Sequence, residues 1–146
     1  MKIKLVWVGK TKERFIDEGI KKYVTLLKPY ADVSVVEIRD EKGKDVDRMV
    51  EREGDRILKL QIPYVLLDEK GKDYTSREFS DFLGKRASSL SFVVGGPYGV
   101  SEIVRGAARH IISLSKMTLT HEMARLLLVE QLYRAFTIIR GRGYHH

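Results

Sequence analysis

The stretch SFVVGGPYGV, residues 91–100, is the clearest candidate for a ligand-binding loop in this chain. An apolar run at residues 92–94 stops abruptly in the sequence GGPYG. Glycine lets a ligand approach bare backbone, and proline stiffens the turn. The loop matches neither of the common nucleotide-binding signatures, GxGxxG and GxxxxGK[ST], and residues 92–104 contain no lysine or arginine. The loop therefore favours a ligand that lies against backbone amides and carbonyls, such as an adenine ring or an amino acid.

The C-terminal sequence RGRGYHH, residues 140–146, is a second candidate for chemistry, because it combines two arginines, a tyrosine and two histidines. We interpret it as a mobile basic segment that carries a stacking ring and a titratable group. The chain has four histidines, His110, His121, His145 and His146. No pair has the spacing of a zinc site and the chain contains no cysteine, so we predict no metal site. His110 begins a predicted strand and favours a structural role, whereas His121 suits either a ligand or RNA contact or an ordinary helix start.

Glu130 and Arg134 are four residues apart and can pair along the last predicted helix. Their apolar neighbours indicate that both side chains are partly buried. The pair is either a structural ion pair or one wall of a site. No Ser-His-Asp arrangement, reactive cysteine or carboxylate pair stands out, so the sequence gives no support to hydrolysis.

Composition and charge narrow the class of protein. The chain has 146 residues, of which 43% are hydrophobic, and this suits one domain with a real core. Its net charge is +7, and residues 105–146 hold seven basic residues against two acidic ones. This basic end favours a nucleic-acid partner, although a soluble basic surface would look the same. No apolar run is long enough to span a membrane and the N-terminus lacks a signal peptide, so we expect a cytoplasmic protein.

The order of the predicted elements gives the fold class. Strands are predicted at residues 2–8, 33–38, 64–71, 92–94 and 110–115, with a helix after each, the last at about 122–139. This alternation predicts one α/β domain over residues 1–146, with a mostly parallel sheet and helices on both faces. Ligands bind beyond the carboxyl ends of such strands. Three strand ends are candidates for a ligand site: Leu67 with Asp68, the glycine loop and residues 114–119. Periodicity does not show whether they meet in space.

The last predicted helix is apolar on more than one side. Such a helix is buried on more than one side as well. It is either a central core helix or a helix whose second face packs against another subunit. We favour a homodimer, because a chain of this size has few other elements to enclose a helix.

Several motifs together resemble a known family. They are VGGPYGVS at 94–101, S-x₅-H-x₃-R at 115–125, LYRA at 132–135, the terminal Tyr-His and the N-terminal KIKLVWVGK. With these motifs the whole chain closely resembles the ribosomal RNA large subunit methyltransferase H family, a bacterial branch of the SPOUT methyltransferases. The resemblance implies methyl transfer from S-adenosylmethionine to N3 of a pseudouridine in 23S ribosomal RNA, on assembled ribosomes and without a metal. It also implies a C-terminal trefoil knot and a homodimer that holds the methyl donor at its interface.

The resemblance also assigns roles to residues. It places the donor against Leu67, Gly95, Gly96, Leu114, Ser115, Lys116, Met117, Thr118 and Leu119. His145 becomes a candidate for orienting or deprotonating the target base, or for a phosphate contact alone, and Tyr144 a candidate for catalysis by stacking on the RNA. We expect phosphate contacts from Arg125, Arg140 and Arg142.

The chain departs from the family pattern at two positions. Many members have proline where this chain has Thr120, and a lysine or arginine where it has His146. Two other readings stay open beside the main one. In the first, the protein is another SPOUT methyltransferase that acts on transfer RNA. In the second, it is a ribosome-binding protein that has lost catalysis.

Overall fold

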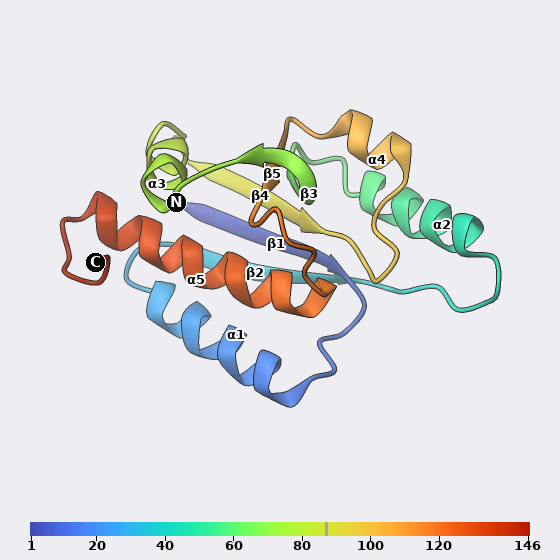
Figure 1. Cartoon of the computed structure of the whole chain (residues 1–146), viewed down its shortest axis with the longest axis horizontal. Coiled ribbons are helices and arrows are strands. Elements are labelled where there is room, and N and C mark those ends of the chain that lie inside the picture. The colour runs from blue at the N-terminus through green and yellow to red at the C-terminus, as the bar shows by residue number, and fades with distance from the viewer. Residues whose placement is uncertain (87) are drawn as a thin grey trace.

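A computed structural model describes residues 1–86 and 88–146 (Figure 1). Within these residues the strands are β1 (Lys2–Val8), β2 (Asp32–Ile38), β3 (Val65–Asp73), β4 (Ser89–Val94) and β5 (His110–Ser113). The helices are α1 (Arg14–Leu27), α2 (Val46–Leu58), α3 (Ser76–Gly84), α4 (Glu102–Ala107) and α5 (His121–Ile139). Each predicted strand and the predicted last helix lies where the sequence placed it, within a few residues.

The strands form one sheet in the order β2-β1-β4-β3-β5, and every neighbouring pair is parallel. Figure 1 shows the arrowheads of β1 and β4 pointing to the same end of the molecule, with the C-terminus of the chain at the other end. The predicted mostly parallel sheet is therefore confirmed. Its carboxyl ends lie along one edge, where a parallel sheet binds its ligands.

Helices cover both faces of the sheet, as predicted, and the alternation along β1 explains how. Leu5 and Trp7 face a core built with α1, α3 and α5, whereas Val6 and Val8 face a second core with α2 and α4. Successive side chains of a strand point to opposite faces, so the uninterrupted apolar run of β1 serves both cores.

The pairing of β3 with β5 contains an irregularity that shapes the carboxyl edge. Leu67 and Lys72 both pair with Ile112, so residues 68–71 leave the ladder between them. At Gly71 a Cβ would lie 2.7 Å from the backbone carbonyl of Ile111, so only glycine permits this close approach of the two strands. The sequence predicted the end of this strand at residue 71, but the strand resumes after the bulge and ends at residue 73.

The trefoil knot stays a prediction, because the order of the strands in the sheet does not by itself trace a knot. The assignment of residues 1–146 to one domain likewise stays an expectation. No helix in the described part of the chain is both long and apolar enough to cross a membrane.

Candidate active site

A cleft of about 580 Å³ lies where the three strand ends meet, at the carboxyl edge of the sheet. Its walls come from the bulge of β3, the glycine loop after β4 and the segment that joins β5 to α5. Clefts of roughly 300–1,000 Å³ are typical of small-molecule and cofactor sites. The structure thus brings together the three segments that periodicity could not connect.

Eight of the nine residues expected at the methyl donor line this cleft, namely Leu67, Gly95, Gly96, Leu114, Ser115, Met117, Thr118 and Leu119. Lys116 is not among the lining residues. Its side chain is exposed and its Nζ lies 3.5 Å from a carboxylate oxygen of Asp73. The side chain of Lys116 therefore pairs with the end of β3, and a contact of Lys116 with the methyl donor stays a prediction.

The glycine loop owes its sequence to its own folding as well as to any ligand. The N–H of Gly99 donates to the carbonyl of Gly96 at 3.0 Å, which closes a turn with Pro97 at its second position. A Cβ on Gly95 would lie 2.8 Å from the side chain of Val100 and 3.0 Å from the backbone of Gly99. The sequence suggested that glycine is needed at position 95 to let a ligand approach the backbone. The structure adds a second reason, because a side chain there would collide with the rest of the loop.

Two charged side chains on the walls of the cleft form an ion pair, and a third accepts a hydrogen bond from a hydroxyl. Arg105 of α4 lies 2.9 Å from Asp68, and the hydroxyl of Thr118 donates to Glu69 at 2.5 Å. Lys70 is the remaining charged residue in the lining, so two acidic residues face two basic ones. The cleft has no excess of positive charge, which agrees with a ligand held mainly by backbone groups.

The start of α5 forms the remaining wall, where Thr120 and His121 both line the cleft. The hydroxyl of Thr120 accepts a hydrogen bond from the N–H of Met123 at 3.1 Å and caps the helix. Proline, which many family members have here, offers no such acceptor, so threonine supplies its own stabilisation. Burial and then the charge of Arg125 lower the pKa of His121, so its ring is neutral at neutral pH.

Arg125 requires a correction, because its side chain is fully buried and does not face a phosphate. Its guanidinium donates to the carbonyl of Val8 at 2.6 Å and to the hydroxyl of Thr11 at 3.0 Å, and it lies over the ring of Trp7. A phosphate contact needs an exposed guanidinium. Arg125 instead holds the loop after β1 against α5. Its position one turn into a predicted helix did not indicate that the side chain is buried.

Glu122 holds the same loop from the neighbouring turn of α5. Its carboxylate accepts hydrogen bonds from the backbone N–H groups of Lys12 and Glu13 at 2.9–3.1 Å. Burial alone would raise the pKa of Glu122, but these two N–H groups and the charge of Arg125 outweigh it and lower the pKa. The carboxylate therefore stays ionised at neutral pH.

The C-terminal segment folds back on α5 and differs from the free, mobile tail that the sequence suggested. The N–H of Gly141 donates to Ile138 and that of Arg142 to Thr137, with Gly141 at a φ of 66°. This pattern is a Schellman motif, which reverses the chain at a helix end. Arg140 and Arg142 remain exposed, as a phosphate contact requires.

The predicted ion pair between Glu130 and Arg134 is present. The reversed tail places Tyr144 and His145 against it. Tyr144 donates to Glu130 at 3.1 Å, and Arg134 lies 3.1 Å from Nδ1 of His145. Since a guanidinium only donates, Nδ1 accepts, and the proton of a neutral His145 ring is on Nε2. Burial, and then hydrogen bonds to Tyr23 and Glu130, raise the pKa of Tyr144, so its hydroxyl keeps its proton.

Comparisons with known proteins give the family. Residues 1–145 match the family model described as "Predicted SPOUT methyltransferase". "Ribosomal RNA large subunit methyltransferase H" of Geotalea daltonii is 47% identical over 153 aligned residues that span 100% of both chains. The protein of the same name from Thermodesulfovibrio yellowstonii is 47% identical over 99% of both. A solved structure titled "a probable methylase family protein from Haemophilus influenzae Rd KW20" superposes with a TM-score of 0.59 at 14% identity, covering 99% of this chain and 70% of that one.

The fold, the cleft at the carboxyl ends of the strands and the family match define a class, the SPOUT-type α/β methyltransferases. The full-length identities are more specific than the class. Within the SPOUT methyltransferases, the chain belongs to the ribosomal RNA large subunit methyltransferase H family. The similarity to the Haemophilus structure supports the fold alone.

Several residues that line the cleft were not among those expected at the methyl donor. Glu69 belongs to the bulge of β3, Arg105 lies on a short helix and Tyr98 is exposed within the glycine loop. A bulge leaves no periodic signal, so Glu69 could not be placed. Arg105 had a weak signal, since Ser101 caps its helix and the helix follows the glycine loop directly.

Replacement of Gly95 by alanine tests whether the folding of the loop controls ligand binding. The new Cβ would force the backbone near Gly99 and the side chain of Val100 to move by a few tenths of an ångström. We expect Gly95→Ala to weaken binding of S-adenosylmethionine by about tenfold or more in calorimetry, a loss of ~1.4 kcal/mol.

Gly106→Ala is the matched control, because a Cβ on Gly106 of α4 meets nothing within 4 Å. It should bind the donor as the unsubstituted protein does. Equal donor affinity for Gly95→Ala and Gly106→Ala would contradict a role for the loop geometry.

Proposed function

We propose that the protein transfers a methyl group from S-adenosylmethionine to N3 of a pseudouridine in 23S ribosomal RNA, on the assembled ribosome. One observation carries the proposal. Three segments that are far apart in the sequence converge on a single cleft in a chain that belongs to a ribosomal RNA methyltransferase family. Relatives at 47% identity over the full length bear the name of a large-subunit ribosomal RNA methyltransferase.

The cleft suits S-adenosylmethionine in size and in the chemistry of its lining. Backbone groups of Gly95, Gly96 and residues 114–119 offer donors and acceptors to an adenine ring and to an amino-acid moiety. The balanced charge of the walls suits a ligand whose own charges are mixed. Bound there, the donor supplies a methyl group on a positively charged sulfur, and transfer to N3 releases one proton and leaves S-adenosylhomocysteine.

The protein must then position the base in line with the methyl group and accept the proton from N3. We assign the proton-handling or base-orienting role to His145 and RNA stacking to Tyr144. The ion pair with Glu130 supports this assignment, because Arg134, which Glu130 orients, holds His145 by Nδ1 and leaves Nε2 as the ring nitrogen that would meet the base. Arg140 and Arg142, which are exposed beside them, would contact phosphates.

Geometry supports a homodimer in which the tail of one protomer serves the cleft of its partner. His121 lines the cleft at the start of α5, whereas Arg134 holds His145 thirteen positions further along the helix. At 1.5 Å per residue this separation is about 20 Å, too far for the docked tail to reach the cleft of its own chain. A second copy of the chain removes this difficulty.

Exposed apolar side chains around the cleft support the same arrangement. Tyr98, Ile103 and Met117 are 62%, 64% and 78% exposed, and Tyr98 and Met117 line the cleft. A group of large exposed apolar side chains beside a ligand cleft is typical of an interaction surface. Contact with a second protomer would cover them and enclose the donor.

Transfer of labelled methyl from S-adenosylmethionine tests the proposal. Ribosomes that lack the modification, protein-free 23S ribosomal RNA and transfer RNA would be compared, and the labelled nucleotide mapped. We expect label at N3 of one pseudouridine of 23S ribosomal RNA, with ribosomes as the preferred substrate. Label on transfer RNA alone would assign the protein to another branch of SPOUT enzymes, and no label with no donor binding would leave a ribosome-binding protein without catalysis.

Substitution of the two terminal histidines separates catalysis from RNA contact. We expect His145→Ala to lower kcat about 100-fold, the scale of general acid–base catalysis, with little change in KM for ribosomes. His146→Ala is the control and should stay within about twofold, because His146 is exposed. A rise in KM for His145→Ala with kcat unchanged would reassign His145 to a phosphate contact.

A further inference from the structure

The cleft at the carboxyl ends of the strands, where we propose that S-adenosylmethionine binds, is the donor cleft. A second cleft, of about 410 Å³, lies at the opposite edge of the sheet. Residues near the amino ends of all five strands line it, together with the segments after α3 and before β3. Lys2 and Lys4, which lie in this lining, occupy the same face of β1 as Val6 and Val8. Neither the expected donor residues nor the tail contributes to it.

The second cleft exists because helices cover only half of this face of the sheet. Val6 and Val8, in the carboxyl half of β1, are buried beneath α2 and α4. Lys2 and Lys4, in the amino half, pair along the sheet with positions whose side chains are Asp32, Ser34, Ser89 and Ser91. On this face of the sheet, the side chains thus change from apolar beneath α2 and α4 to polar and cationic beyond them. Such a change is expected where no helix covers the sheet.

The charge of this cleft is strongly one-sided. Lys2, Lys4, Arg86 and Arg109 line it, and Asp32 is the single carboxylate in the lining. Within residues 1–86 and 88–146, no acidic group lies within 4.0 Å of the charged nitrogens of these four cationic side chains. The donor cleft, by contrast, is lined by equal numbers of acidic and basic residues.

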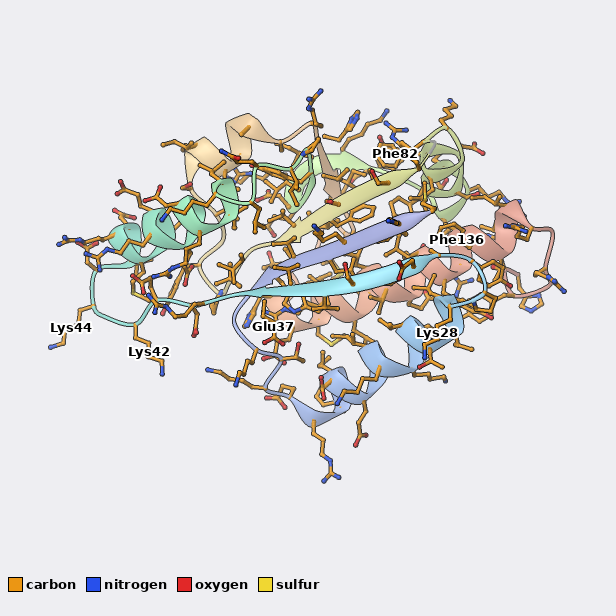
Figure 2. The ribbon with its side chains drawn as sticks, turned by 180° about the vertical axis from the view of Figure 1, so that it is seen from behind. Lys28, Glu37, Lys42, Lys44, Phe82 and Phe136 are labelled. Atoms are coloured by element: carbon orange, nitrogen blue, oxygen red, sulfur yellow. The ribbon has the colours of Figure 1, made fainter. Side chains whose placement is uncertain are left out.

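Arg86 is held in a fixed orientation at the rim of the second cleft. Its guanidinium lies over the ring of Phe82 at 3.5 Å, donates to the carbonyl of Phe82 at 2.7 Å and lies 3.1 Å from Nε2 of His110. Figure 2 shows Phe82 at the end of the molecule far from Lys42 and Lys44. The cation is therefore preorganised, although no carboxylate of the described residues pairs with it.

The spacing of these cations suits a chain of phosphates better than a single one. Lys2 and Lys4 are two positions apart on β1, about 6.6 Å along the strand, and the other cations come from separate elements. Lysine, arginine and serine side chains are the usual partners of the phosphates in a nucleic-acid backbone. Ser34 and Ser91, which flank Lys4 in the sheet, add hydroxyl donors to the lining.

We infer that this cationic cleft at the amino ends of the strands binds the phosphate backbone of RNA, as a second contact with the ribosomal RNA substrate. The inference rests on the proposed function for the identity of the RNA. Lys2 and Val8 lie at opposite ends of β1, six residues apart. At about 3.3 Å per residue, this separates the contact from the donor cleft by about 20 Å. It contributes affinity and orientation for RNA without touching the methyl donor.

The test is the salt dependence of RNA binding by the triple variant Lys2→Gln, Lys4→Gln, Arg109→Gln. The probe is protein-free 23S ribosomal RNA, with no donor present. Each lost phosphate contact reduces the slope of log affinity against log salt by about 0.7–0.9, so we expect a slope smaller by about 2 to 3. The affinity at 0.15 M salt should fall by more than about tenfold for the same reason.

The matched control removes the same number and kind of charges at the other end of the molecule. Lys42→Gln, Lys44→Gln, Arg48→Gln alters exposed side chains beside the start of α2, two of which Figure 2 shows pointing away from the chain. We expect this control to keep the slope of the unsubstituted protein. Donor affinity, measured by calorimetry, should be equal in all three proteins and reports that they are folded.

An unchanged slope in the first triple variant, or an equal change in both, would overturn the inference. Weaker binding to ribosomes with unchanged binding to protein-free RNA would also overturn it, because the cleft would then bind an acidic ribosomal protein. The readout is binding and not methyl transfer. Absence of methyl transfer by the unsubstituted protein would therefore contradict the proposed function while leaving this result interpretable.

Discussion

The anchoring of α5 to the loop after β1 is the constraint on which the donor cleft depends. Glu122 accepts from the backbone of Glu13, and Arg125 donates to the carbonyl of Val8. Burial lowers the pKa of Arg125 to about 10, which leaves it charged at neutral pH. Burying a charge costs free energy unless hydrogen bonds compensate it, and the guanidinium donates to both Val8 and Thr11, so these contacts fix the start of the helix. Residues 114–120 lead directly into that start, and their place over the cleft follows from it.

The two edges of the sheet carry different chemistry because of how the helices cover it. At the carboxyl edge the loops close on one another around a cleft, and Asp68 and Arg105 pair on its wall. At the amino edge the cover of α2 and α4 ends, and Lys2 and Lys4 replace the apolar residues of the same face. A small donor with mixed charges and a large polyanion would thus be bound at separate places, without competing for the same cations.

Local patterns predicted the fold well, since β-branched runs and helical spacing mark each element in isolation. They also selected the donor-cleft segments, because glycine and strand ends are visible in the sequence. Contacts between distant segments could not be predicted. Arg125 looked like a surface arginine until its partners after β1 were placed, and the bulge that brings Glu69 to the cleft depends on pairing with β5. The docking of Tyr144 and His145 depends on a reversal at Gly141 that composition alone represented as a flexible tail.

A crystal structure of the protein with S-adenosylhomocysteine would test the central claim most directly. The account predicts the ligand in the cleft at the carboxyl edge, against the backbone of Gly95, Gly96 and residues 114–119, with the cleft at the amino edge free of it. It also predicts a second protomer that brings its Tyr144 and His145 to the same cleft. Ligand bound at the amino edge, or a donor cleft closed by its own chain in a monomer, would contradict the account.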